Sequence, residues 1–166
     1  MEELFFCEIR DLYDAEKQLI EALPEMAKAA SSDELRCFFE KHLRQTSRQV
    51  KRLERVFKVL GEKKATGRKC AAIAGLIEEA NEIVSADGDR AVRDAGLIAV
   101  ARKVEHYEVS GYGSAWAHAE ILGYGKAARL LDQTLIEEEE AKETLTGMAP
   151  RASNRFDLPK TRSAVG

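Results

Sequence analysis

Proline is scarce in this chain. Only three prolines occur among 166 residues, while 45% of the residues are hydrophobic. Because proline breaks helices and strands alike and 166 residues can bury a substantial core, this composition favours a single helical globular domain.

Membrane and export signals are also missing. No apolar run reaches 18 residues, so we expect no membrane-spanning helix. The short apolar run Leu4–Cys7 is followed at once by charged residues, which is too brief for a secretory signal. No CxxC spacing occurs among the three cysteines, which are Cys7, Cys37 and Cys70. Unpaired thiols are typical of a reducing compartment, so we expect a cytoplasmic protein.

An excess of positive charge is absent. The chain has 26 Lys and Arg against 29 Asp and Glu, a net charge of −3. Overall charge therefore provides no attraction to nucleic acid or to an anionic membrane. The basic residues near the C-terminus are spread over a dozen positions, which is typical of a solvated tail. They are Arg151, Arg155, Lys160 and Arg162.

What the chain does contain is helical periodicity. Four long segments repeat inward positions at steps of three and four, the spacing of a bundle core. They run over about 2–30, 31–60, 89–122 and 126–148. The turns near residues 30 and 123 are short, so each joins two antiparallel helices. The long connection between Gly61 and Gly88 carries an additional short helix over about 70–85 and is long enough to cross the bundle.

These signals predict an all-α four-helix bundle over residues 1–149, with one long crossover that carries the additional helix. Ser31 and Glu34 form a capping-box pattern at the start of the second segment. Pro24 lies inside the first segment and predicts a kink there. Pro150 is expected to end the last helix, leaving residues 150–166 as a loosely ordered tail.

Polar residues interrupt the inward stripe of each long segment at the same depth. A carboxylate facing a bundle core has lost its water and needs a cation, a proton or a hydrogen-bond donor. Four carboxylates carry a charge of −4, which two divalent cations would neutralise. Helix-borne glutamates with a histidine are how bundle di-iron and di-manganese sites are made. The candidate metal ligands are Glu16, His42, Gln49, Glu105, Glu108 and Glu138.

Each candidate leaves an alternative open. The glutamates could instead share protons in a buried hydrogen-bonded network. A shift of one residue in helix phase would turn Glu137 inward in place of Glu138. His42 could bond a backbone carbonyl, and Gln49 offers only a neutral amide oxygen. His106 points about 100° away from the flanking glutamates, which places it beside the site or at an interface.

Long motifs add a resemblance to a known family. They include Asp11-Leu12-Tyr13-x-Ala15-Glu16-Lys17-Gln18-Leu19, Gln49-Val50-x-Arg52-Leu53 and Val104-Glu105-His106-Tyr107-Glu108. In these the chain resembles the bacterial YciE/YciF-like stress-associated proteins of the ferritin-like superfamily. The resemblance implies a rubrerythrin-like bundle, dimer formation and a role in stress responses. Relatives commonly have acidic residues in place of Arg44 and Gln45 and an aspartate in place of Lys142, so segment 31–60 supplies no carboxylate to the predicted site here.

Two classes of function remain open. The first is a metal-dependent protein that binds iron or manganese and handles iron, oxygen or peroxide, with or without turnover. The second is a structural or interaction protein whose polar core is vestigial. A DNA-protecting shell is disfavoured, because such proteins place the metal between subunits. Apolar residues outside the core stripe, namely Val100, Val109 and Trp116, predict a homodimer.

Overall fold

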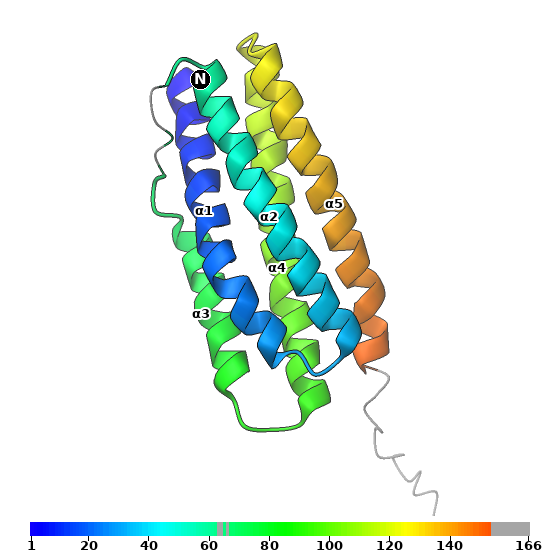
Figure 1. Cartoon of the computed structure of the whole chain (residues 1–166). Helices are drawn as coiled ribbons and strands as arrows, with labels where there is room; N and C mark the ends of the chain where they lie inside the picture. The colour runs from blue at the N-terminus through cyan, green and yellow to red at the C-terminus, as the bar shows by residue number, and fades with distance from the viewer. Residues whose placement is uncertain (63–64, 66, 154–166) are drawn as a thin grey trace, which may run out of the picture.

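The computed structural model describes residues 1–62, 65 and 67–153, and for 150–153 it describes the backbone only. The elements in these ranges are all helical: α1 (Glu2–Ala29), α2 (Asp33–Val59), α3 (Ala71–Ser85), α4 (Arg90–Ile121) and α5 (Gly125–Ser153). The four long helices form a bundle and α3 lies along its side (Figure 1). None of the described helices is both long and apolar enough to cross a membrane.

The order of helices around the bundle is α1, α2, α5, α4. Helix α2 packs against α1 and α5, α4 packs against α5 and α1, and α3 packs against α1 and α4. The α1–α2 turn and the α4–α5 turn lie at opposite ends of the bundle, and α3 makes the return between α2 and α4 (Figure 1). The predicted all-α bundle with a helix in its long crossover is confirmed.

Two glycines follow the C-caps of long helices. Gly61 follows Leu60, the C-cap of α2, and Gly123 follows Leu122, the C-cap of α4, with φ of 84° and 74° respectively. This left-handed region is open to glycine without steric cost, so the helices end where the sequence predicts.

The start of α2 differs from the prediction by one residue. Ser32, not Ser31, is the N-cap, and its side chain accepts a hydrogen bond from the Leu35 N–H. The backbone N–H and hydroxyl of Ser31 instead donate to the Asp94 carboxylate, each at 2.8 Å, and the Ser32 N–H also donates to Asp94 at 2.8 Å. Because Ser31 binds Asp94, it does not cap α2, and these hydrogen bonds hold the α1–α2 turn against α4.

Proline stops neither helix that contains it. Helix α1 runs through Pro24, and α5 continues past Pro150 to Ser153. The prediction that Pro150 ends the last helix is wrong, because a proline near a helix end removes one backbone hydrogen bond without preventing the final turn. Of the tail expected over 150–166, residues 150–153 are helical and residues 154–166 lie outside the described part of the chain.

The core consists of two apolar clusters with buried polar residues between them. One cluster lies toward the α1–α2 turn and includes Leu19, Phe39 and Leu97. The other lies toward the α4–α5 turn and includes Phe5 and Phe57. We call the buried polar residues between them the polar layer: Glu16, His42, Thr46, Gln49, Glu105, Glu108, Thr134 and Glu138.

Helix α3 covers part of the apolar surface that was predicted to lie outside the core stripe. Val100, expected outside the core stripe, is 1% exposed and belongs to the same cluster as Ile73 and Ala80 of α3. Trp116 remains 39% exposed. Part of the apolar excess that predicted a dimer is therefore buried within the chain itself.

Candidate metal centre

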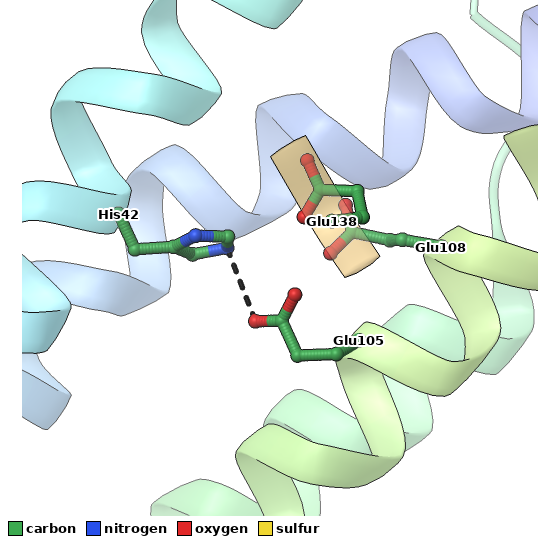
Figure 2. Close-up of side chains that lie close together, drawn as sticks. All are labelled: His42, Glu105, Glu108 and Glu138. Atoms are coloured by element: carbon green, nitrogen blue, oxygen red, sulfur yellow. Dashed lines mark ion pairs between the residues drawn. The ribbon is translucent and has the colours of Figure 1, made fainter. Parts of the chain in front are cut away.

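Four side chains of the polar layer converge on one space. His42, Glu105, Glu108 and Glu138 each offer one ligand atom, and these atoms lie within 4.8 Å of one another. Figure 2 shows His42 of α2 on one side and the three glutamates facing it. We call this set the ligand group.

Helix geometry places the glutamates. Glu105 and Glu108 are one turn apart on α4, so they share a face, and each is 1% exposed. Glu138 comes from α5 and is fully buried, whereas Glu137 stays partly exposed. Of the two phases that the sequence left open, the structure has Glu138 inside.

His42 has no hydrogen-bond partner in the described protein at either ring nitrogen. The ring is 3% exposed and stacks on Phe38, with centroids 5.7 Å apart and planes 9° apart. Burial, with a smaller effect of the Lys41 charge, lowers the pKa of His42 to about 4. At neutral pH the imidazole is therefore uncharged and keeps the free lone pair that metal ligation requires.

His42 Nε2 lies 3.4 Å from Glu105 Oε1. Burial raises the pKa of Glu105 well above its usual value, and the charge of Glu138 raises it further. Since the imidazole of His42 is neutral at pH 7, the dashed line in Figure 2 marks a close approach of the two side chains and not an ionic bond.

The remaining carboxyl groups also favour protonation. Burial raises the pKa of Glu16 and of Glu108 well above the usual range, and neighbouring glutamates add to this rise. Burial likewise raises the pKa of Glu138, to about 7. Carboxylates this close cannot all ionise without positive charge among them, so the layer holds either protons or cations.

Glu16 and Gln49 lie beside the ligand group and not within it. The Tyr112 hydroxyl donates a hydrogen bond to Glu16 Oε1, and the charge of Glu138 helps to raise the pKa of Glu16. The Gln49 amide nitrogen donates to Glu138 Oε1 and, at 3.0 Å, to Glu137 Oε2. The structure thus brings four of the six predicted ligands within 4.8 Å of one another and leaves two alongside.

The family of the chain follows from comparison with known proteins. The profile of a family described as a domain of unknown function, DUF892, matches residues 1–157. The chain belongs to the DUF892 family. Protein YciF of Escherichia coli strain K12 is 44% identical to it over 155 residues, which are 93% of each chain. The predicted likeness to YciF-like proteins is confirmed.

Solved structures extend the comparison. The crystal structure of the E. coli stress protein YciF matches with a TM-score of 0.89 and 44% identity, covering 93% of this chain and 98% of that one. YcfI of Rhodopseudomonas palustris, described as a candidate structural protein, matches with a TM-score of 0.85 and 42% identity, covering 88% and 92%. A Xanthomonas campestris protein, 20% identical with a TM-score of 0.73 and 93% coverage of both chains, shares the fold. The DUF892 chain is a ferritin-like helical bundle.

Arg52 of this DUF892 chain binds residues beside the ligand group, although it was not predicted from the sequence as a site residue. Arg52 Nη1 and Nη2 donate to the two oxygens of Glu137, each at 2.9 Å, and Nη1 donates to Thr134 Oγ1 at 2.7 Å. Burial alone would raise the pKa of Glu137, but the hydrogen bonds and charge of Arg52 lower it. The available signal was spacing, since Arg52 follows Gln49 by three residues and shares its helix face.

His106 lies away from the polar layer. Its ring is exposed, and Nδ1 is 2.6 Å from the Arg102 carbonyl oxygen. Of the tyrosines, Tyr112 reaches a glutamate of the layer, whereas the Tyr13 hydroxyl donates to Glu54 at 3.2 Å and lies outside it. The exposed ring of His106 thus does not lie beside the site, and its expected place at an interface stays a prediction.

Unsatisfied atoms test whether a metal fits. Among the described residues, ten buried side-chain nitrogens and oxygens lack a hydrogen-bond partner, and seven of them belong to the six predicted ligands. Buried polar atoms are almost always paired, so this concentration indicates a missing partner. Nitrogen and carboxylate ligands bind at about 2.0–2.2 Å, so ligands of one ion lie roughly 3 to 4.5 Å apart. The ligand group, with three carboxylates and an imidazole, fits a divalent ion of this kind.

Proposed function

We propose that this chain is a ferritin-like stress-response protein that binds a dinuclear centre of iron or manganese in its polar layer. The observation that carries the proposal is that each of the six predicted ligands has a buried atom without a partner. The stress role is taken from YciF, its relative at 44% identity.

The charges support two ions in preference to one. The ligand group supplies the donors for a first ion. Glu16 Oε2 and Gln49 Oε1, both buried and unpartnered, supply oxygens for a second. The Arg52 charge lowers the pKa of Glu16 and of Glu138. However, Arg52 is already paired with Glu137, and a single cation does not offset four glutamates. Two divalent cations would balance them.

The protein's own contribution is to hold these groups in a dry core. Tyr112 fixes one oxygen of Glu16, and Gln49 fixes one oxygen of Glu138. Phe38 stacks on His42 and sets the plane of its ring. A bound pair of redox-active ions would supply the capacity to handle oxygen or peroxide.

A structural protein with a vestigial site is the second candidate. Hydrogen bonds from Tyr112 to Glu16 and from Gln49 to Glu138 hold part of the layer without any metal. The raised pKa values of the glutamates allow them to persist as neutral acids. The R. palustris relative described as a candidate structural protein favours the same alternative.

Metal analysis combined with thermal melts separates the two candidates. Protein purified without chelator should carry about two iron or manganese ions per chain, and adding Fe²⁺ or Mn²⁺ to the stripped protein should raise its stability. At a free metal concentration of 100 Kd the gain is about 2.7 kcal/mol. Glu105→Gln should reduce this gain, whereas Glu139→Gln, at an exposed neighbour of the site, should retain it. If added metal does not change the melting temperature of the wild type, the dinuclear function fails and the vestigial structural protein remains.

Assembly and location belong to the same proposal. Val92, Trp116 and Ile121 of α4 are 53%, 39% and 69% exposed, which favours self-association as a homodimer. A monomeric mass by light scattering at micromolar concentration would contradict it. The free thiols of Cys7, Cys37 and Cys70 favour the cytoplasm.

A further inference from the structure

A small cavity between α2 and α5 reaches His42 of the ligand group. Its volume is about 20 Å³, which is room for about one water molecule. His42 and Gln45 line it from α2, and Glu137, Glu140 and Thr144 line it from α5.

The lining runs from the surface to the site. Glu140 and Thr144 are exposed, whereas His42 is 3% exposed and both of its ring nitrogens lack a partner. Gln45, 7% exposed, lies between these extremes. The lining therefore joins exposed residues to a buried side chain whose ring nitrogens have no partner.

We propose that this cavity is the port through which water-sized species reach the ligand group, and that its width restricts the site to them. A water molecule or a single metal ion matches its size, whereas organic substrates exceed it. The part of this proposal that concerns metal ions rests on the proposed function, whereas the part that concerns water depends only on the cavity.

The outer charges of the port favour cations. Glu137 is neutralised by Arg52, which leaves Glu140 as the acidic group of the lining, opposed by Lys41. A carboxylate at the mouth of a narrow opening raises the local concentration of cations, and salt screens this effect. Glu140→Gln should therefore slow metal loading at low salt and not at high salt, with Glu139→Gln, exposed and outside the lining, as its control. Equal loading by both variants at low salt would overturn the role of Glu140.

Two variants change the width of the port. Thr144→Trp should close it and Gln45→Ala should widen it, because both residues line the cavity. Thr146→Trp is the matched control. Thr146 is also exposed on α5, and both threonine hydroxyls donate to the carbonyl four residues earlier at 2.8 Å, but Thr146 lies outside the lining.

The first measurement is the rate of Mn²⁺ and anaerobic Fe²⁺ uptake by stripped protein in stopped flow. Thr144→Trp should slow loading by about tenfold or more, since ions must then wait for opening motions, and Gln45→Ala should accelerate it. The final metal content should equal that of the wild type in each variant. Identical rates in the wild type and both port variants would overturn the proposal.

The second measurement needs no metal. Deuterium exchange at the Cε1–H of His42, followed by mass spectrometry in D₂O, reports the access of water to the ring, and the exposed His106 of the same chain is the internal reference. Exchange should be slower in Thr144→Trp and faster in Gln45→Ala. If the protein takes up no metal but His42 exchange follows this order, the dinuclear function fails and the port stands. If the exchange rate of His42 is the same in the wild type and in both variants, the port proposal is wrong.

Discussion

His42 Nε2 and Glu105 Oε1 lie 3.4 Å apart, both in the core, and no hydrogen bond satisfies the histidine nitrogen. This separation is close to that of two ligands on one tetrahedral ion with bonds of about 2.1 Å. Burial lowers the pKa of His42 to about 4, so the imidazole is neutral at pH 7, and burial raises the pKa of Glu105 well above its usual value. The pair is thus arranged to bind a cation after Glu105 gives up its proton.

The stability of the metal-free protein should rise as pH falls from about 8 to about 5.5. Glu138, with a pKa of about 7 when folded against 4.5 ordinarily, binds a proton more tightly in the folded state, so its stabilising effect is lost as pH rises through 7. Glu16, Glu105 and Glu108 act in the same direction. The lowered pKa of His42 has the opposite effect, because protonation below its ordinary pKa of 6.5 favours unfolding, but this is one group against four glutamates.

Urea unfolding in chelator across this pH range is the measurement. The control is Glu138→Gln, which removes one titrating carboxyl and should flatten the dependence near pH 7. Stability that stays constant or falls on acidification would contradict the assignment of protonated glutamates.

Glu105→Gln should stabilise the metal-free protein at about pH 8 while weakening metal binding. Burial raises the pKa of Glu105, so an ionised Glu105 opposes folding at this pH, whereas glutamine fills nearly the same volume and carries no charge. We expect a gain of about 1 to 3 kcal/mol. Chemical denaturation with chelator measures it, and Glu139→Gln on the surface should change stability little. A loss of stability in Glu105→Gln would instead indicate a tuned hydrogen bond of a vestigial core.

Asp94→Ala should destabilise the protein by about 2 to 4 kcal/mol, with or without metal. The Asp94 carboxylate is 4% exposed and accepts hydrogen bonds from the Ser31 hydroxyl and from the N–H groups of Ser31 and Ser32, each at 2.8 Å. Asp89→Ala removes only the exposed N-cap of α4 and should cost about 1 kcal/mol. Equal losses in the two variants, measured by urea unfolding, would show that Asp94 does not hold the α1–α2 turn to α4.

The cysteines should differ in reactivity. Cys37 is exposed and should react at once with a thiol reagent. The Tyr107 hydroxyl uses its single proton on Asp11, so at 3.0 Å it accepts from the Cys70 thiol, and burial raises the pKa of Cys70. Cys70 should therefore react only when the native structure opens. Labelling followed by peptide mass spectrometry measures both rates, and Cys37→Ser should remove a fast phase. Comparable rates for Cys37 and Cys70 would contradict this arrangement.

Spacing along the chain was sufficient to predict the bundle, its turns and the depth of the polar layer. Steps of three and four residues identify which face of each helix is buried, and the glycines at 61 and 123 identify where α2 and α4 end. Glu16 and Glu105 were therefore expected at the same depth, and the structure buries both in one layer.

Spacing could not decide which of these atoms face one another, because that depends on helix rotation and on partners from other helices. Tyr112 of α4 occupies one oxygen of Glu16, and Arg52 of α2 holds Glu137 away from the ligand group. In the same way Asp94 displaces Ser31 from the cap of α2. The sequence by itself determined which face of each long helix is turned inward and at what level its polar residues lie. Only the tertiary structure decided which buried atoms are satisfied by the protein and which are left for a ligand, because hydrogen bonds between helices distant in sequence compete for each one.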